Sequence, residues 1–346
     1  MADPSIHKLK GTLGNSTELD AIANPSLQHI GILVRDIEAT TEELSKIWGI
    51  DSWETLEFAP PQSAMKVGNT FKIKMANANL LGLLLHIAQP LEDVDTFAET
   101  SPVWGKWLQK SFGGIQHICV SVNNWDQVVA KAVERGGRIY KSTSYEGKRC
   151  AHIEGEIGNL VVEIEERAKP GVTKEKAVGI SNVKGKIGNS TELDMIANPS
   201  LQHLGVWVRD ENPFMRYMTK VWGIDDWETL EFIPPQETMM VGKSFRLGMC
   251  NANLLGLLLH VSERLEDADT FAKSAPVWAE WERTHGEGLY HICVSVSNWE
   301  KVVDIVKSRG AHLYASSSYE GRRWAHFQNP ISGIIVEIEE RPNLPL

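Results

Sequence analysis

The chain has 346 residues, enough for about two domains of ordinary size, each with a substantial hydrophobic core. Its hydrophobic fraction of 42% is typical of a globular protein, and the formal net charge of −10 argues against nucleic acid or an anionic membrane surface as a main partner. The sequence shows no signal-peptide core, no membrane-spanning segment and no Cys-x-x-Cys pair, so we expect a cytoplasmic protein with reduced thiols.

An eight-residue motif occurs four times and organises the chain. At 27–34 it reads Leu-Gln-His-Ile-Gly-Ile-Leu-Val, and related copies begin at Ile115, Leu201 and Leu289. The motif predicts a buried strand that is apolar on both faces, in which the histidine at the third position is the exception. One such histidine would usually be a hydrogen-bonded structural residue. Four at the same strand position favour a shared functional role.

The second half of the chain repeats the first at a constant distance of 174 residues, which relates His29 to His203 and Glu163 to Glu337. We therefore expect two domains, 11–167 and 185–341, joined by a linker at 168–184 whose prolines, glycines and lysines suit an exposed segment. Residues 1–10 are expected to form a loose arm.

Each half is predicted to contain two units of one strand, one helix and three strands. In the first unit, Asp36 caps a helix that ends at Gly49, and three strands follow near 53–58, 70–75 and 80–87, with Asn77 to Asn79 as the turn. A connecting helix has Ser101 as its cap and begins at Pro102. The second unit has a strand at 115–122, a helix at 124–135 and strands at 138–141, 150–153 and 160–164. The fold class is therefore α+β, built from four βαβββ modules.

Three histidines and one glutamate within the strands of each half form a candidate metal site. A carboxylate in an apolar strand costs several kcal/mol to bury unless it is paired or binds a metal. Imidazole and carboxylate ligands suit a divalent Zn, Mn, Fe, Co or Ni ion and leave positions for water or substrate. The predicted ligands are His29, His86, His117 and Glu163 in the first half and His203, His260, His291 and Glu337 in the second.

With these residues in view, the chain resembles the vicinal oxygen chelate superfamily, which includes glyoxalase I, methylmalonyl-CoA epimerase, extradiol dioxygenases and bleomycin-resistance proteins. In that family, paired βαβββ modules curl into a cup around a metal, with one ligand from the first strand and one from the last strand of each module. The stretch from Pro90 to Ile118 and the segment Val161-Val162-Glu163 look similar to the epimerase. The tandem duplication also resembles the 2-epi-5-epi-valiolone epimerases, which act on a cyclitol ketone.

The resemblance implies a metal-dependent isomerase or epimerase that removes a proton beside the carbonyl group of a small polar hydroxyketone, with the metal stabilising an enediolate. It implies two cup-shaped domains, in a monomer that imitates a dimer or in a homodimer of the chain. Glu163 and Glu337 are expected to act as ligand and base, and His152 and His326 are candidate proton shuttles near neutral pH.

Two departures from the epimerase pattern change these expectations. His86 and His260 stand where the epimerase has glutamine, and Lys72 and Arg246 stand where it carries a second catalytic glutamate, so neither a two-base mechanism nor a coenzyme A substrate is expected. We predict instead that cationic and phenolic side chains contact the substrate, although the repeated loop that holds four of them also fits a solvated turn. These residues are Lys72, Tyr145, Arg149, Arg246, Tyr319 and Arg323.

Two other functions stay open at this stage. An Fe²⁺ extradiol-type dioxygenase would use two histidines and one carboxylate, and the additional His86 argues against it. A metal-free module that sequesters a small molecule, like the bleomycin-resistance proteins, would leave the quartet incidental. The sequence also leaves open whether the ligands pair within one half or across the two halves.

Overall fold

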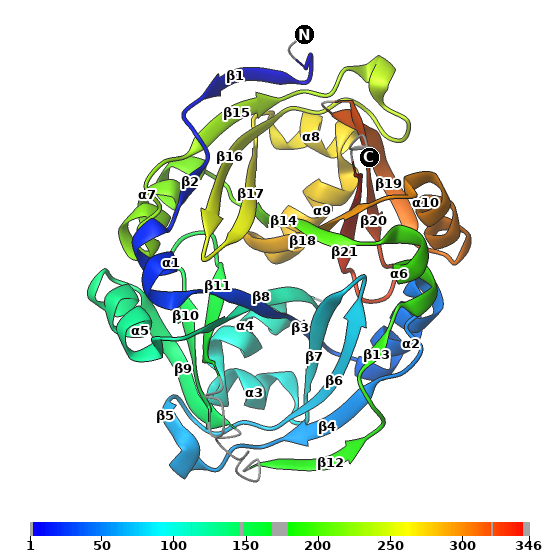
Figure 1. Cartoon of the computed structure of the whole chain (residues 1–346). Helices are drawn as coiled ribbons and strands as arrows, with labels where there is room; N and C mark the ends of the chain where they lie inside the picture. The colour runs from blue at the N-terminus through cyan, green and yellow to red at the C-terminus, as the bar shows by residue number, and fades with distance from the viewer. Residues whose placement is uncertain (1–2, 112, 146–147, 168–178, 320, 342–346) are drawn as a thin grey trace.

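Two large curled β-sheets, one for each half of the chain, form the framework of the computed structural model (Figure 1). The structure describes residues 3–111, 113–145, 148–167, 179–319 and 321–341. The described strands of the first sheet follow the order β12-β4-β6-β7-β3-β8-β11-β10-β9-β5, with β13 beside β6. Those of the second follow β1-β15-β16-β17-β14-β18-β21-β20-β19, with β2 beside β16.

The described elements up to the end of the first half are β1 (Ile6–Lys10), β2 (Gly14–Asn15), α1 (Thr17–Ala23), β3 (Ser26–Val34), α2 (Ile37–Trp48), β4 (Glu54–Phe58), η1 (Gln62–Ala64), β5 (Met65–Val67), β6 (Ile73–Leu80), β7 (Leu83–Pro90), α3 (Val94–Thr100), α4 (Pro102–Lys110), β8 (Gly113–Val122), α5 (Trp125–Glu134), β9 (Arg138–Tyr145), β10 (Lys148–Glu154) and β11 (Val161–Glu166).

The described elements of the second half are β12 (Ile180–Lys184), β13 (Gly188–Asn189), α6 (Thr191–Ala197), β14 (Ser200–Trp207), α7 (Glu211–Trp222), β15 (Glu228–Phe232), η2 (Gln236–Thr238), β16 (Leu247–Leu254), β17 (Leu257–Arg264), α8 (Ala268–Ser274), α9 (Pro276–His285), β18 (Gly288–Val296), α10 (Trp299–Ser308), β19 (His312–Tyr319), β20 (Arg322–Gln328) and β21 (Ile335–Glu340).

Each sheet consists of two βαβββ modules joined through their first strands. In the first half, β3 pairs in parallel with β7, the last strand of its module, and β8 pairs in parallel with β11. The antiparallel pair of β3 and β8 joins the two modules into one curled sheet. The second half repeats this arrangement with β14, β17, β18 and β21. The predicted α+β fold of four modules in two cups is confirmed.

The predicted start and end of helix α2 are confirmed, whereas the predicted position of the turn between β6 and β7 is wrong. The Asp36 carboxylate accepts a hydrogen bond of 2.9 Å from the Ala39 amide at the start of α2, and Gly49 ends that helix with φ 70°, as predicted. The turn predicted at Asn77 to Asn79 is wrong, because those residues lie within β6. The chain reverses at Leu81 and Gly82, with φ values of 48° and 78°. Leucine rarely adopts a positive φ, and here burial of its side chain, which is 1% exposed, compensates for the strain.

The segments that lead into each half cross to the other half's sheet. β1 and β2 pair with β15 and β16, whereas their repeats, β12 and β13, pair with β4 and β6 (Figure 1). The predicted loose arm at 1–10 is therefore wrong for Ile6–Lys10, and the predicted linker at 168–184 is wrong for Ile180–Lys184. The boundaries at residues 11 and 185 are also displaced, because Gly14–Asn15 and Gly188–Asn189 belong to the opposite sheets. Residues 168–178 of that linker lie outside the described residues.

The two halves share one continuous apolar core. Trp48 of α2 packs edge to face on Phe327 of β20, with ring centroids 6.4 Å apart, and its indole N–H donates a 2.9 Å hydrogen bond to the Asn329 side chain. All four cysteines are free and buried, as expected. Among the described helices, none is long and apolar enough to cross a membrane.

Candidate metal centre

The register of the first sheet places reactive side chains in one row across five strands. Glu163 on β11 lies opposite Cys119 on β8 and opposite His152 on β10. His152 in turn lies opposite Lys141 on β9, and Cys119 lies opposite His29 on β3. Because directly paired residues project on the same face of a sheet, this row faces the concave side of the cup.

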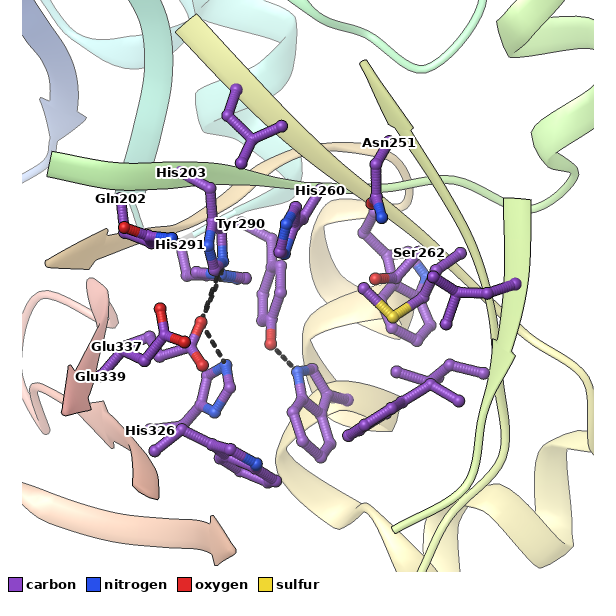
Figure 2. Close-up of a pocket in the computed structure, with 18 of the residues that line it drawn as sticks. Gln202, His203, Asn251, His260, Ser262, Tyr290, His291, His326, Glu337 and Glu339 are labelled. Atoms are coloured by element: carbon purple, nitrogen blue, oxygen red, sulfur yellow. Dashed lines mark hydrogen bonds and ion pairs between the residues drawn. The ribbon is translucent and has the colours of Figure 1, made fainter. Parts of the chain in front are cut away.

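Two histidines and one glutamate converge within each half. In the first cup, Glu163 Oε2 lies 3.2 Å from His29 Nε2 and 3.3 Å from His117 Nε2, and the two imidazole nitrogens are 3.2 Å apart. The corresponding distances in the second cup, between His203, His291 and Glu337, are 3.0, 3.1 and 3.0 Å (Figure 2). The ligand atoms therefore group within one half rather than across the two.

Glu163 and His29 have the protonation states that a cation requires. Burial would raise the pKa of Glu163, but His152, His117 and His29 outweigh burial and hold that pKa well below the usual carboxyl range. Burial lowers the pKa of His29, which favours the neutral imidazole. An ionised carboxylate beside a neutral imidazole is the kind of donor pair that binds divalent ions.

The spacing of the three ligand atoms also fits one ion. Two atoms that each lie about 2.1 Å from a metal, at roughly 90–110° to one another, are about 3.0–3.4 Å apart. The observed separations of 3.0–3.3 Å fall within this range. In the described part of the chain, imidazoles are the only basic groups that the Glu163 carboxylate meets within 4 Å. The residues present therefore fit a divalent metal.

A second group orients one of these ligands in the first cup. His117 Nδ1–H donates a 2.8 Å hydrogen bond to Gln116 Oε1, which leaves the Nε2 lone pair directed at the trio. Gly31 makes room for this ring, because a Cβ atom at that position would lie 1.9 Å from His117 Cε1. Gly205 has the same relation to His291. Sequence reasoning missed both glycines, although they recur in the first-strand motif of each half.

The predicted four-ligand set needs correction at His86 and His260. The His86 ring stacks on His29 with centroids 3.7 Å apart, and His260 stacks on His203 at the same distance (Figure 2). Neither belongs to a described group of three ligand atoms that lie within 4.8 Å of one another. The reason is register: His86 on β7 lies opposite Gly31, which places it against the side of His29. His86 lines the cavity beside the trio.

The two histidines predicted as proton shuttles lie beside the trio. Nε2 of His152 is 3.6 Å from Glu163 Oε2, and Nε2 of His326 is 3.6 Å from Glu337 Oε2. Neither ring nitrogen of His152 has a hydrogen-bond partner among the described residues. Burial lowers the pKa of both histidines to about 3, so that each ring is neutral at pH 7.

Four of the predicted substrate contacts lie outside the cavities. Arg149 forms ion pairs with Glu166 and Asp126 and covers the Trp125 ring. Arg323 repeats this arrangement with Glu340, Glu300 and Trp299. Lys72 is exposed before β6, and Arg246 pairs with Glu231. These four predictions are wrong. Arg149 and Arg323 point away from the cavities because alternate strand residues point to opposite faces, and Lys72 and Arg246 lie just before β6 and β16 rather than within them. The side chains of Tyr145 and Tyr319 lie outside the described part of the chain.

The same alternation identifies two cations that sequence reasoning missed. Lys148 and Arg322 line the cavities, since they share the strand face of His152 and His326. Lys148 pairs with Glu165 at 2.9 Å, and Arg322 pairs with Glu339 at 3.1 Å.

Both cavities have the size of a small-molecule site. The first has a volume of about 390 Å³, and its polar lining includes Gln28, Asn77, Lys141 and Lys148. The second has a volume of about 230 Å³, and its lining includes five rings of Phe, Trp and Tyr. These rings are Phe232, Trp207, Trp278, Tyr290 and Trp324.

Comparison with known proteins agrees with this arrangement. Residues 28–152 match the model of the Glyoxalase/Bleomycin resistance protein/Dioxygenase superfamily. No curated protein matches the chain. A mutant of 4-hydroxymandelate synthase from Streptomyces coelicolor is similar in structure, with a TM-score of 0.58, 12% identity and 92% of each chain covered. A xylose isomerase-like TIM barrel/4-hydroxyphenylpyruvate dioxygenase fusion protein has a TM-score of 0.51 and 9% identity, over 93% of this chain and 50% of its own. At identities this low, the structural similarity shows a shared fold, and it extends over both halves of the chain.

Proposed function

Because this chain carries a domain of the glyoxalase/bleomycin-resistance/dioxygenase superfamily, also called vicinal oxygen chelate proteins, we propose that it is a metal-dependent isomerase or epimerase of a small polar hydroxyketone. One observation carries the proposal. A neutral histidine without a hydrogen-bond partner among the described residues, His152, lies 3.6 Å from the carboxylate of a trio that fits a divalent metal. A proton acceptor beside a Lewis acid is the requirement for removing a proton next to a carbonyl group.

His29, His117 and Glu163 would hold the metal in the first cup, and His203, His291 and Glu337 would hold it in the second. When bound, a divalent ion supplies Lewis-acid polarisation of two neighbouring substrate oxygens, which acidifies the C–H bond beside the carbonyl. The burial of the trio and of His152 excludes water, which strengthens every electrostatic interaction within the cup.

The proton transfer is assigned to His152 rather than to Glu163. Glu163 Oε2 already lies within 3.3 Å of two imidazoles and is committed to the metal site. His152 has a nitrogen free to take the substrate proton and can return it to the neighbouring carbon, which gives a one-base isomerisation. His326 has the same position beside Glu337 in the second cup.

One specific observation favours a second candidate function, an Fe²⁺ dioxygenase. Because His86 stacks on His29 and lies outside the trio, each cup presents two histidines and one carboxylate, the ligand set of many non-heme Fe²⁺ oxygenases. One of the similar structures contains, by its name, a 4-hydroxyphenylpyruvate dioxygenase.

The test is exchange of a substrate C–H proton with deuterated water, over a panel of sugar-like and cyclitol ketones that includes 2-epi-5-epi-valiolone. The purified full chain, loaded with Zn²⁺ or Mn²⁺, is expected to catalyse exchange without oxygen. His152→Gln should lower that exchange by about 100-fold or more if the first cup turns over, and His326→Gln is the matched variant of the second cup. Oxygen uptake with a catechol after anaerobic Fe²⁺ loading, without exchange on any ketone, would replace the isomerase with the dioxygenase.

A further inference from the structure

The first cup contains a buried lysine that the proposed proton transfer does not use. Lys141 on β9 is 2% exposed and lines the first cavity. Its ammonium nitrogen lies 3.4 Å from the centre of the Phe71 ring and 3.6 Å from that of Trp104, and it donates a 3.1 Å hydrogen bond to Ser101 Oγ. No ion pair joins it to a carboxylate in the part of the chain that the structure describes. Burial lowers the pKa of the Lys141 amine well below its usual range, and a bound anion would supply the counter-charge that stabilises the ammonium form.

The side chain of Ser101 binds Lys141 instead of capping the helix that follows it. Ser101 precedes Pro102 at the start of α4, where a serine normally caps the helix, yet its side chain makes no capping hydrogen bond. The hydroxyl instead accepts a hydrogen bond from Lys141. The predicted cap at Ser101 is therefore replaced by a contact that holds the amine at the cavity wall.

The second cup shows that the lysine and serine form a separable unit. At the repeat positions of Lys141 and Ser101 it has Ala315 and Ala275, so both polar partners are absent together. The two rings that surround the amine are kept as Phe245 and Trp278. Because the second cup is built with these rings and without the lysine, the rings alone do not account for it.

We propose that Lys141 binds a carboxylate group of the substrate in the first cup, at the end remote from the metal. This inference rests on the proposed function, in which the metal holds two neighbouring oxygens at the other end. Lys141 and Glu163 share one row, with β10 between their strands. With strands about 4.8 Å apart, their Cα atoms are separated by roughly 10 Å, so the amine lies across the cavity from the trio.

The donors at this position suit a carboxylate. One ammonium group beside one hydroxyl balances a single negative charge, whereas a phosphate with nearly two charges would require a second cation. The other lysine of this cavity wall, Lys148, is already paired with Glu165. The first cup is therefore assigned a small carbonyl compound with one distal carboxylate, and the second cup a substrate without it.

The experiment compares two chelating probes of equal length, of which only one has a distal carboxylate. 2-Oxoglutarate and 2-oxopentanoate are titrated calorimetrically into the Zn²⁺-loaded full chain that carries His203→Ala, so that only the first cup holds metal. The longer pair, 2-oxoadipate and 2-oxohexanoate, is tested in the same way, in case the distance from the metal to the amine requires one more methylene group. We expect the better-fitting dicarboxylate to bind at least tenfold more tightly than its matched monocarboxylate. Lys141→Met, or Lys141→Ala as in the second cup, should abolish that preference and leave monocarboxylate binding unchanged.

The outcomes separate this inference from the proposed function. If one zinc ion binds per chain but the dicarboxylate preference is absent, or survives in Lys141→Met, the role of Lys141 is overturned while the metal centre stands. If zinc does not bind, both are overturned. The converse test transfers the lysine and the serine to the second cup by Ala315→Lys with Ala275→Ser. In a chain that also carries His29→Ala, so that only the second cup holds metal, this change should create a preference of about tenfold for the dicarboxylate.

Discussion

The two cups share a metal trio and differ in the walls around it. Their ligands superimpose residue for residue, down to a histidine 3.6 Å from each carboxylate. The first wall is polar and carries Cys150 and Lys141, whereas the second has Trp324 and Ala315 at the same positions. The trio comes from β3, β8 and β11, and the variable wall comes largely from β9 and β10. Duplication has therefore kept the candidate metal ligands, while the residues of the cavity wall diverged on separate strands.

The hydrogen bonding of the metal-ligand histidines also differs between the two cups. Gln116 fixes the ring of His117 in the first cup, but Tyr290 takes its place in the second and receives a hydrogen bond from Trp278. As a result, Nδ1 of His291 has no hydrogen-bond partner among the described residues. The first cup therefore holds its ligands in a more defined tautomer, and we expect it to bind metal more tightly.

The largest expected effect follows from removing one ligand charge at a time. Glu163→Gln should lower metal affinity in the first cup by at least about 100-fold and reduce bound metal from two ions per chain to one. Glu337→Gln should do the same in the second cup. Metal analysis of the purified variants, combined with turnover, identifies the cup that is active. If either variant keeps two ions, that carboxylate is not a ligand.

The difference in ligand support predicts a smaller, graded effect. Gln116→Leu should weaken metal binding in the first cup by about 10–100-fold, because His117 loses the acceptor that sets its tautomer. Competition with a chelator of known affinity measures the change. The matched variant, Tyr290→Gln, should strengthen the second cup. Equal affinities in all three proteins would contradict the proposed role of Gln116.

A third difference lies at the start of the second helix of each half and predicts a pH effect. The Ile37 amide donates a 2.8 Å hydrogen bond to Gln89, whereas the Glu211 amide donates a 2.9 Å hydrogen bond to Glu263. Burial, with Glu263 and Asp210 nearby, raises the pKa of Glu211 to about 7. The folded chain therefore binds more protons than the unfolded chain between the ordinary glutamate pKa of 4.5 and about 7, and its stability falls as pH rises through that window.

The size of that effect is modest because Glu211 is only partly buried. After allowance for solvent screening, we expect a loss of ~1 kcal/mol between pH 4.5 and pH 8. Glu263→Gln, which copies the first half, should reduce it and raise the melting temperature at pH 8 by about 2–4 °C. Gln89→Glu alone should not introduce the same pH dependence, because the first half has Ile37 at the position of Glu211. Identical pH profiles of melting temperature in the unmodified chain and in Glu263→Gln would refute the assignment.

The smallest effect is expected from substitutions on the outer faces of the two sheets, where both halves carry the same arginine ion pairs. Arg149→Ala and Arg323→Ala should each cost at most about 1 kcal/mol of unfolding free energy, because exposed ion pairs are screened. Neither should change kcat or KM, since both side chains point away from the cavities. Thermal unfolding and steady-state kinetics check this, and a raised KM in either variant would return that arginine to the substrate site.

Strand periodicity and the repeat were sufficient to predict the modules and a set of four ligands that contains the trio. Alternation marks His29 and Glu163 as polar exceptions within apolar strands, and the duplication shows which polar residues recur. Strand register was not predictable, and it decided that His86 stacks on His29 instead of joining the trio. Lys141 was missed because its role depends on contacts with residues distant in sequence. The pairing of β1, β2, β12 and β13 with the opposite sheets was not predicted, because a strand joins a sheet edge through backbone hydrogen bonds that any sequence can make.

The exchange of leading strands has a consequence for how this chain can be divided. A fragment cut between residues 167 and 168 would retain β1 and β2, which complete the sheet it has lost, and would lack β12 and β13, which complete its own. Each isolated fragment would expose a bare sheet edge and carry an unpaired strand, a combination that invites polymerisation. The ancestral single-copy gene product, if it used the same pairing, was an obligate interlocked dimer, and fusion of the two copies made that partnership permanent.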